Sequence, residues 1–104
     1  MSRNPPHKWL LNIQPNAQKR FNSLSITEKR GVFRRIRELL NADDPYAAPF
    51  IEMLKEKKFE RVRKFRVGNY RVFMVIEFAE ITHQEHTYRG TLFLLDIRDR
   101  KEAY

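Results

Sequence analysis

The chain of 104 residues contains no cysteine, which excludes a disulfide scaffold, thiolate chemistry and any zinc site built on cysteine. It also lacks a run of roughly 20 apolar residues that could cross a membrane. Its start, "MSRNPPHKW", has no apolar segment of the kind found in secretory signals. We therefore expect a cytoplasmic protein without a membrane partner.

The apolar content is high enough for folding without a disulfide or a metal, since 41% of the residues are hydrophobic and 12% are aromatic. A chain of this length fits one compact domain, residues 1–104, and leaves no room for a second core. No internal repeat or low-complexity segment interrupts it. We expect a single domain that requires no cofactor.

Acidic residues are too few to balance the basic ones: 21 Lys and Arg stand against 13 Asp and Glu, a formal net charge of +8. Such an excess concerns the binding partner rather than the fold. It is concentrated between Lys55 and Arg71, where eight Lys or Arg and two Glu give a net charge of +6, while residues 41–54 and 72–97 each carry −3. This concentration indicates a groove for a polyanion, nucleic acid first. The alternative is an ordinary solvated basic face.

The first half of the chain predicts one strand and two helices. Residues 7–13 form a short strand, with Trp9 as a core anchor, and Pro15 opens a helix. The sequence "SITE" (25–28) has the form of a capping box, so a second helix begins there and ends at "NADDP" (41–45). The apolar stripe of this helix comprises Val32, Phe33, Ile36, Leu39 and Leu40. Its basic outer face comprises Arg30, Arg34 and Arg37.

The second half predicts one helical turn within residues 49–56 and then strands. The strands 59–67 and 70–78 flank Gly68-Asn69, a hairpin signal because both residues tolerate positive φ. Residues 81–90 are polar and read as an extended loop or ragged hairpin tip, and residues 91–99 form the last strand. The expected fold is α+β, with an N-terminal strand and a helical hairpin packed on a small antiparallel β-sheet. The other sheet face is left partly open for a site. The residues expected in the core of the 70–78 strand are Phe73, Met74, Val75 and Ile76.

Three segments in this order resemble the RelE/ParE superfamily of bacterial toxins: "LKEKKFERVRKF" (54–65), "RVGNYRVF" (66–73) and "LLDIRDRKEAY" (94–104). The likeness spans Trp9 to Tyr104. Its most specific parts are the Arg-Val-Gly-Asn-Tyr-Arg turn and the terminal Arg-x-x-x-x-x-Tyr. The resemblance implies a RelE-like fold and a role in a type II toxin–antitoxin system.

Two branches of this superfamily share the fold and differ in target. RelE-like members are endoribonucleases (mRNA interferases) that cut mRNA on the translating ribosome through attack of the RNA 2′-hydroxyl on the adjacent phosphate. ParE-like members inhibit DNA gyrase without catalysis. The basic residues favour the RelE-like branch. A ParE-like inhibitor and an inactive RNA-binding relative are the alternatives, since fold alone does not decide function.

The resemblance also implies roles for individual residues. Lys64 corresponds to a base or electrostatic helper, Arg71 to a phosphate-binding arginine, Arg98 to a general acid or charge stabiliser, and Tyr104 to a base-stacking tyrosine. These residue types suit the chemistry, because arginine matches phosphate oxygens and aromatic rings stack on unpaired bases. The residues expected to hold the RNA backbone are Lys57, Lys58, Arg61, Arg63, Arg66 and Arg100.

Other patterns allow a second interpretation. Val62 occupies the position of a second lysine in many RelE-like enzymes, with Arg61 and Arg63 beside it. Arg98 could instead form a salt bridge with Asp96 or Asp99. His83 and His86, with Glu85 between them, read as part of an exposed loop rather than a metal site.

The partners implied by the resemblance are a cognate antitoxin protein, mRNA and the ribosome with its rRNA. The antitoxin would cover the basic groove with its C-terminal segment, and an acidic amphipathic helix or strand would suit the charge. The protein is expected to be a monomer when free and part of a hetero-oligomer with the antitoxin.

Overall fold

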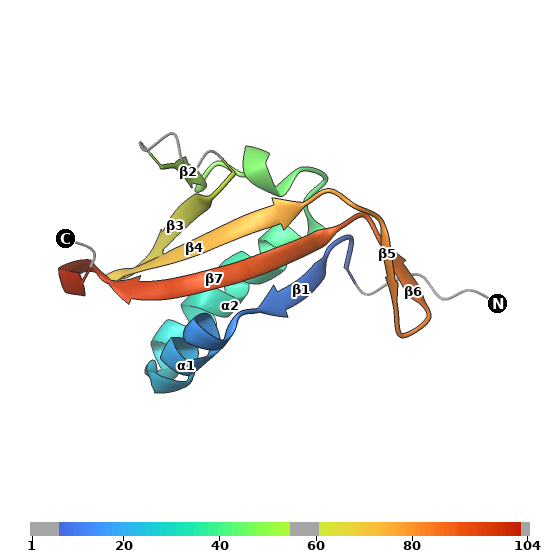
Figure 1. The fold of residues 1–104 in the computed structure, drawn as a ribbon. Coiled ribbons are helices and arrows are strands. Elements are labelled where there is room, and N and C mark those ends of the chain that lie inside the picture. The colour runs from blue at the N-terminus through green and yellow to red at the C-terminus, as the bar shows by residue number, and fades with distance from the viewer. Residues whose placement is uncertain (1–6, 55–60, 103–104) are drawn as a thin grey trace.

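The computed structural model describes residues 7–54 and 61–102, which form two α-helices, a five-stranded sheet and a separate two-stranded hairpin (Figure 1). The elements in chain order are β1 (Leu10–Ile13), α1 (Pro15–Ser23), α2 (Ile26–Asn41), the 3₁₀ turn η1 (Pro45–Ala47), β2 (Glu52–Met53), β3 (Arg63–Val67), β4 (Tyr70–Glu77), β5 (Ile81–His83), β6 (His86–Tyr88), β7 (Thr91–Asp99) and the 3₁₀ turn η3 (Arg100–Glu102). The predicted α+β fold is confirmed. Within the described ranges, no helix is long and apolar enough to cross a membrane.

The main sheet has the strand order β1-β7-β4-β3-β2. The strands β3, β4 and β7 pair antiparallel, as predicted. The strand β2 also pairs antiparallel with β3, whereas β1 runs parallel to β7. The sheet is therefore mixed, and its first strand is shorter than the predicted 7–13. Parallel neighbours require a long crossover connection, and the helices and strands between β1 and β7 provide it.

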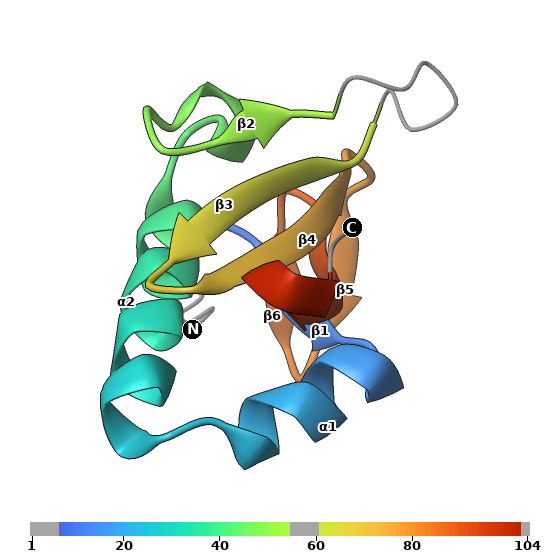
Figure 2. The same cartoon turned by 90° about the vertical axis from the view of Figure 1, so that its left-hand side faces the viewer.

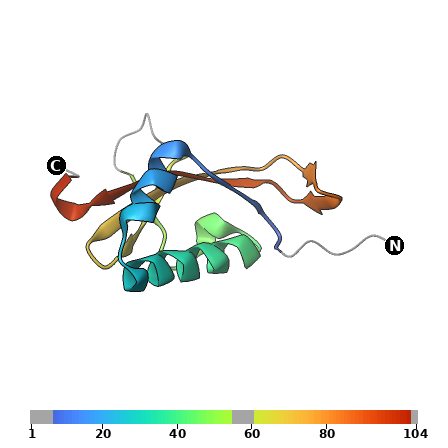
Figure 3. The ribbon, with the colours of Figure 1, turned by 90° about the horizontal axis from the view of Figure 1, so that it is seen from below.

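The two helices begin where their local signals predict. The helix α1 has Pro15 at its first position. At the start of α2, Ser25 Oγ accepts a hydrogen bond from Glu28 N (3.2 Å), and Glu28 Oε1 accepts one from Ser25 N (2.9 Å). The helix α2 crosses one face of the sheet and α1 packs beside β7. Figures 2 and 3 show the helices meeting at an angle at their short connection instead of lying alongside each other as a hairpin.

The core lies between α2 and the sheet, where alternate strand residues point toward the helix. Trp9 closes one end: it is 3% exposed, and its Nε1 donates a hydrogen bond to Ala42 O (2.8 Å), so the predicted core anchor is confirmed. The side chains of this layer that are almost fully buried are Val32, Ile36, Leu39, Phe65, Val72, Met74, Ile76, Leu92, Leu94 and Ile97.

Three residues predicted for the core lie outside it. Phe33 is 47% exposed, because its neighbours Val32 and Ile36 already occupy the face of α2 that meets the sheet. Phe73 and Val75 are half-buried on the opposite sheet face, because successive strand residues alternate in direction. We call this opposite side, which α2 does not cover, the open face (Figure 1). The helix α1 borders it at β7, where α1 residues line a hollow together with Asp96.

Two connecting segments differ from the prediction. The helical turn expected within 49–56 occurs earlier, as η1, where an Asp44 carboxylate oxygen accepts from Tyr46 N (3.0 Å), and Glu52–Met53 instead pairs with β3. Residues 55 and 56 of that turn, and the expected strand start at 59, lie outside the described residues.

The segment 81–90 forms the hairpin β5–β6, which projects beyond the end of the main sheet (Figure 1). Its two turn residues, Gln84 and Glu85, have φ of 49° and 69°. Of the two predicted alternatives, an extended loop or a hairpin tip, the hairpin is thus confirmed, although the sequence lacks the glycine or asparagine that usually marks such a turn. Directly after β6, Arg89 Nη1 donates to Asp43 Oδ1 (3.3 Å), and Lys8 Nζ donates to the same oxygen (2.6 Å). The hydrogen bond from Lys8 and its charge, followed by those of Arg89, lower the pKa of Asp43.

Gly31 marks a close approach of α2 to β3, and it yields a stability prediction. A Cβ atom at this position would lie 2.7 Å from Val67 Cγ1. We predict that Gly31→Ala lowers the free energy of unfolding. Overpacking against Val67 typically costs about 1–3 kcal/mol, which outweighs the roughly 1 kcal/mol by which alanine favours the helix. Urea denaturation measures the change. In a double-mutant cycle, Val67→Ala should relieve the penalty. A Gly31→Ala chain as stable as the original would contradict the close approach.

Candidate nucleic-acid interface

Three arginines form a row across the open face. In the sheet register, Arg66 of β3 lies opposite Arg71 of β4, and Arg71 lies opposite Arg98 of β7. Directly opposed residues of antiparallel strands have Cβ atoms about 4.5–5.5 Å apart. Arg71, in the middle, is only 8% exposed, whereas the outer two are exposed. We call these three residues the arginine row.

The turn between β3 and β4 sets this register. The strands are joined by two residues, and Gly68 has a φ of +58° while Asn69 does not have a positive φ. A positive φ at the first turn position is where a hairpin requires glycine. The predicted Gly-Asn turn is therefore confirmed. Counted from this turn, Val67 and Tyr70 are the first residue pair of the ladder, and Arg66 and Arg71 are the second.

A second row next to the first contains Lys64, Phe73 and Asp96, which lie opposite one another on the same three strands. Lys64 is two residues from Arg66 and so points to the same face. Next to it, Glu52 of β2 lies opposite Lys64. The second row brings the predicted Lys64 next to the arginine row. Asp96 within this row and Glu52 beside it add two carboxylates to the site.

Both outer arginines of the row are paired with these carboxylates. Arg98 Nε donates to Asp96 Oδ2 (2.8 Å), and Arg66 Nε lies 3.5 Å from Glu52 Oε2. Asp96 is itself fixed, because its Oδ1 accepts from Ile97 N (2.9 Å). The predicted alternative of a salt bridge between Arg98 and Asp96 is thus confirmed. Glu52 was not expected in the site, because its segment was predicted as part of a helical turn.

Arg100 lies at the end of the row near the hairpin turn. Its backbone N donates to Asn69 O (2.7 Å), which ties η3 to the turn. A small hollow of about 70 Å³ is lined here by Arg66, Gly68, Asn69, Tyr70, Arg71 and Arg100. Sequence reasoning named Arg66, Arg71 and Arg100 separately, and the structure brings them to one place.

Arg61 and Arg63 lie elsewhere. Arg63 is opposite Met74 and so points to the helix side of the sheet, where its guanidinium carbon is 4.6 Å from the centroid of the Tyr46 ring. The Tyr46 hydroxyl donates to Arg61 O (2.6 Å) and accepts from Ile76 N (2.9 Å). Arg61 Nη2 donates to Ile76 O (3.2 Å).

These two arginines therefore close the end of the β3–β4 ladder and do not join the arginine row. Arg61 and Arg63 also flank Val62, where a second lysine was expected, and the side chain of Arg63 points away from the open face. The remaining predicted residues, Lys57, Lys58 and Tyr104, lie outside the described residues. Among the residues that are described, no three His, Asp or Glu side chains could hold a metal ion.

The arrangement is suited to an oxyanion with several charged oxygens. Like charges directly opposite each other in a sheet are destabilising, and Arg71, in the middle of the row, is almost fully buried. Guanidinium groups bind phosphate oxygens through two parallel hydrogen bonds, and such bonds are stronger than neutral ones. A phosphate on the open face would relieve the repulsion within the row.

Comparison with known proteins supports the fold. No protein-family model and no curated protein sequence matches the chain. The chain is similar to one in the crystal structure of the toxin–antitoxin complex RelBE2 from Mycobacterium tuberculosis, with a TM-score of 0.63, 15% identity and coverage of 94% of this chain and 98% of that one. It is also similar to one in the RelB–RelE antitoxin–toxin complex from Methanococcus jannaschii, with a TM-score of 0.59, 16% identity and coverage of 88% and 93%. The protein thus has a fold that occurs in RelB–RelE toxin–antitoxin complexes.

The arginine row yields a test with a simple anion. We predict that sulfate raises the thermal unfolding midpoint more than chloride does at equal ionic strength, because it binds the folded row. Arg71→Gln should lose most of the difference between the two salts. Sulfate also stabilises proteins in general, so Lys8→Gln, which removes a cation at the opposite end of the sheet, serves as the control and should keep the full difference. An equal response of both variants would show that the row binds no anion.

Proposed function

We propose that the protein is the toxin of a type II toxin–antitoxin pair and that it is an endoribonuclease acting on mRNA in the translating ribosome. The observation that carries this proposal is the arginine row on the open face, with Lys64 in the adjacent row. The fold shared with RelB–RelE complexes supports a place in such a pair. The basic open face favours the RNA-cutting component.

The proposed reaction needs no external nucleophile. The 2′-oxygen of the RNA forms a bond to the adjacent phosphorus, and the bond from phosphorus to the 5′-oxygen of the next nucleotide breaks. A base accepts the proton of the 2′-hydroxyl, and the departing 5′-oxygen takes up a proton. The products are a 2′,3′-cyclic phosphate and a free 5′-hydroxyl. The protein must stabilise the extra negative charge that builds up on the phosphorane.

Arg71 is placed to bind that charge. It is the most buried member of the row, and the attraction between a cation and a phosphate increases where water is excluded. Arg98 and Arg66 flank it, so the phosphate oxygens meet guanidinium groups from three strands. Since a guanidinium stays protonated, Arg98 acts in this scheme by stabilising charge on the leaving group.

Lys64 is the candidate base. It is half-buried, and its side chain points to the same face as Arg66. Phe73, opposite Lys64, adds an aromatic ring to the same face. Tyr104 would stack on a base of the RNA, and this role remains a prediction from the resemblance.

Asp96 and Glu52 have a part in this scheme as well. In the free protein they hold Arg98 and Arg66. A bound phosphate would compete with both carboxylates. Arg66 and Arg98 would then exchange their salt bridges with Glu52 and Asp96 for contacts with the phosphate of the substrate. The antitoxin would inhibit by covering this face, where its acidic side chains would meet the same arginines.

Primer extension on a defined mRNA in a translating bacterial extract tests the proposal. Wild-type protein should produce cuts in register with the codons. Arg71→Ala combined with Arg98→Ala should reduce cleavage by at least a hundredfold, because charge stabilisation at a transition state commonly contributes about 10²–10³ in rate. Lys8→Ala removes a cation at the opposite end of the sheet and should cut like the wild type. Intact mRNA with the wild-type protein would contradict the proposal.

A second candidate is a ParE-like inhibitor of DNA gyrase. Two observations favour it: Val62 replaces the second lysine, and Arg66 and Arg98 are already paired with carboxylates. Supercoiling by purified gyrase distinguishes the two, because only an inhibitor alters it. An inactive RNA-binding relative would show salt-dependent RNA affinity without cleavage.

A further inference from the structure

A polar hollow lies beside the arginine row, where α1 borders β7. It has a volume of about 320 Å³. Four of its lining residues come from α1 and recur at three- and four-residue spacing, as one helical face requires. The residues that line this α1–β7 hollow are Asn16, Lys19, Arg20, Ser23 and Asp96.

The core occupies a different side of α1. Ala17 and Leu24 are buried, and Phe21 packs against the core. These three apolar residues follow one another at four- and three-residue spacing, so they form a stripe of their own on the helix. Packing of α1 therefore does not account for the polar residues that face the hollow.

A β-bulge brings Asp96 to the hollow. In a regular strand, Asp96 would point to the same side as Leu94, which is buried in the core. The ladder between β4 and β7 shifts by one residue after Leu94, so Asp96 pairs with Phe73 and joins the open face. Bulges re-aim side chains in this way and are common next to functional sites.

Asp96 also connects the hollow with the arginine row. Its Oδ2 accepts a hydrogen bond from Arg98 Nε (2.8 Å), and its Oδ1 accepts one from Ile97 N (2.9 Å). A carboxylate has roughly four acceptor sites, so Asp96 can still accept a hydrogen bond from a ligand. A chain molecule that binds along the row would reach the hollow directly beyond Arg98.

The hollow is cationic and contains polar groups without a protein partner. Lys19 and Arg20 carry two positive charges against the single carboxylate of Asp96. Within residues 7–54 and 61–102, the Lys19 ammonium forms no salt bridge and the side-chain amide of Asn16 forms no hydrogen bond. Both side chains are exposed and available to a ligand.

We propose that the α1–β7 hollow binds the nucleotide that adjoins the phosphate held by the arginine row. Lys19 and Arg20 would bind the next phosphate of the RNA chain. Asn16 and Asp96 would form hydrogen bonds with the ribose. This inference rests on the proposed function, since it extends the same RNA chain beyond Arg98.

The residue types favour ribose and phosphate over a base or a simple anion. Among the described residues, none that lines the hollow is aromatic, so a base finds no ring to stack on. The carboxylate of Asp96 would repel a simple anion, but it can accept a hydrogen bond from a 2′-hydroxyl beside the phosphate. We therefore expect the hollow to bind the RNA backbone whatever the base.

Fluorescence anisotropy with the full-length protein and a fluorescein-labelled oligouridylate at low salt tests the hollow. Lys19→Gln combined with Arg20→Gln should weaken binding about tenfold, because the bonds to one phosphate are lost. The slope of log K against log salt concentration should fall by about 0.7, the value for one phosphate contact to a single strand. Circular dichroism confirms that the variant is folded.

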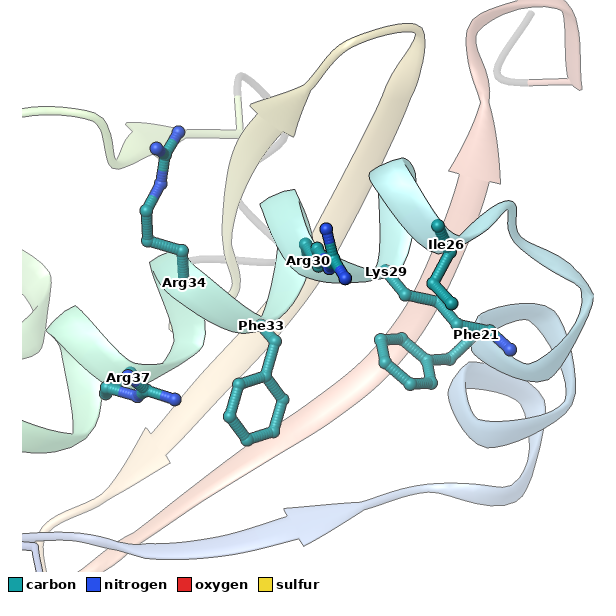
Figure 4. A pocket seen from close by; sticks show the side chains of 7 residues that line it. All are labelled: Phe21, Ile26, Lys29, Arg30, Phe33, Arg34 and Arg37. Atoms are coloured by element: carbon teal, nitrogen blue, oxygen red, sulfur yellow. The ribbon is translucent and has the colours of Figure 1, made fainter.

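A matched control removes two cations from another part of the surface. The outer side of α2, away from the sheet, has a hollow of its own (Figure 4). Four cations, Lys29, Arg30, Arg34 and Arg37, line it together with apolar residues that include Ile26 and Phe33. Arg30→Gln combined with Arg34→Gln changes the net charge equally and should keep the affinity and the salt slope of the wild type.

The length of the RNA locates the effect. Wild-type protein should bind a uridine dinucleotide more weakly than the same dinucleotide extended at one end by an abasic residue that keeps its 2′-hydroxyl. The end at which affinity increases gives the direction of the RNA chain. The Lys19→Gln, Arg20→Gln variant should bind the extended and the unextended molecule equally.

The outcomes separate this proposal from the proposed function. Wild-type affinity in the Lys19→Gln, Arg20→Gln variant, or an equal loss in the α2 control, would overturn the subsite. So would a dinucleotide whose binding depends on Arg71 but gains nothing from extension at either end, and the proposed function would then still stand. Absence of any RNA binding by the wild type would contradict both. Loss of binding to a polyglutamate peptide, with RNA binding unchanged, would assign the hollow to an acidic protein instead.

Discussion

The two-residue turn at Gly68-Asn69 fixes the register between β3 and β4, and the open face depends on it. A slip of one residue would turn every side chain of β3 to the other side of the sheet. Phe65 would then leave the core, and Arg66 would leave its place opposite Arg71. The same pairing of β3 with β4 therefore buries Phe65 in the core on one face and sets Arg66 opposite Arg71 on the other. Folding and the candidate site thus require the same strand register.

Charge is divided between the two sides of this sheet. On the open face, three arginines and a lysine lie close together, and Glu52 and Asp96 offset part of their repulsion. On the far side of α2, four more cations surround an apolar hollow without a carboxylate among them. The two surfaces thus differ in composition, since the open face combines cations with carboxylates and the hollow combines cations with apolar side chains.

Features set by short-range signals could be predicted from the sequence. The capping box at Ser25, the glycine turn at Gly68 and the strand 91–99 are all confirmed, because the residues that determine them are adjacent in the chain. Features set by tertiary contacts could not. Alternation along β3 places Arg63 on the opposite side from Lys64, and pairing of β1 with β7 depends on the whole intervening chain. The exposure of Phe33 follows from how α2 rotates onto the sheet. The row of Arg71 and Arg98 was expected only if their strands pair, and the register brings them face to face.

The central claim is that the arginine row binds an RNA phosphate that is attacked by the 2′-hydroxyl of the adjacent ribose. The most direct measurement uses ribosomes programmed with a synthetic mRNA that carries one 2′-deoxynucleotide at the cut position. Cleavage should stop at that position while the protein still binds the complex, and the unmodified mRNA should give a 2′,3′-cyclic phosphate end. Cleavage of the 2′-deoxy mRNA at the same position would contradict the account, since it would require a different nucleophile.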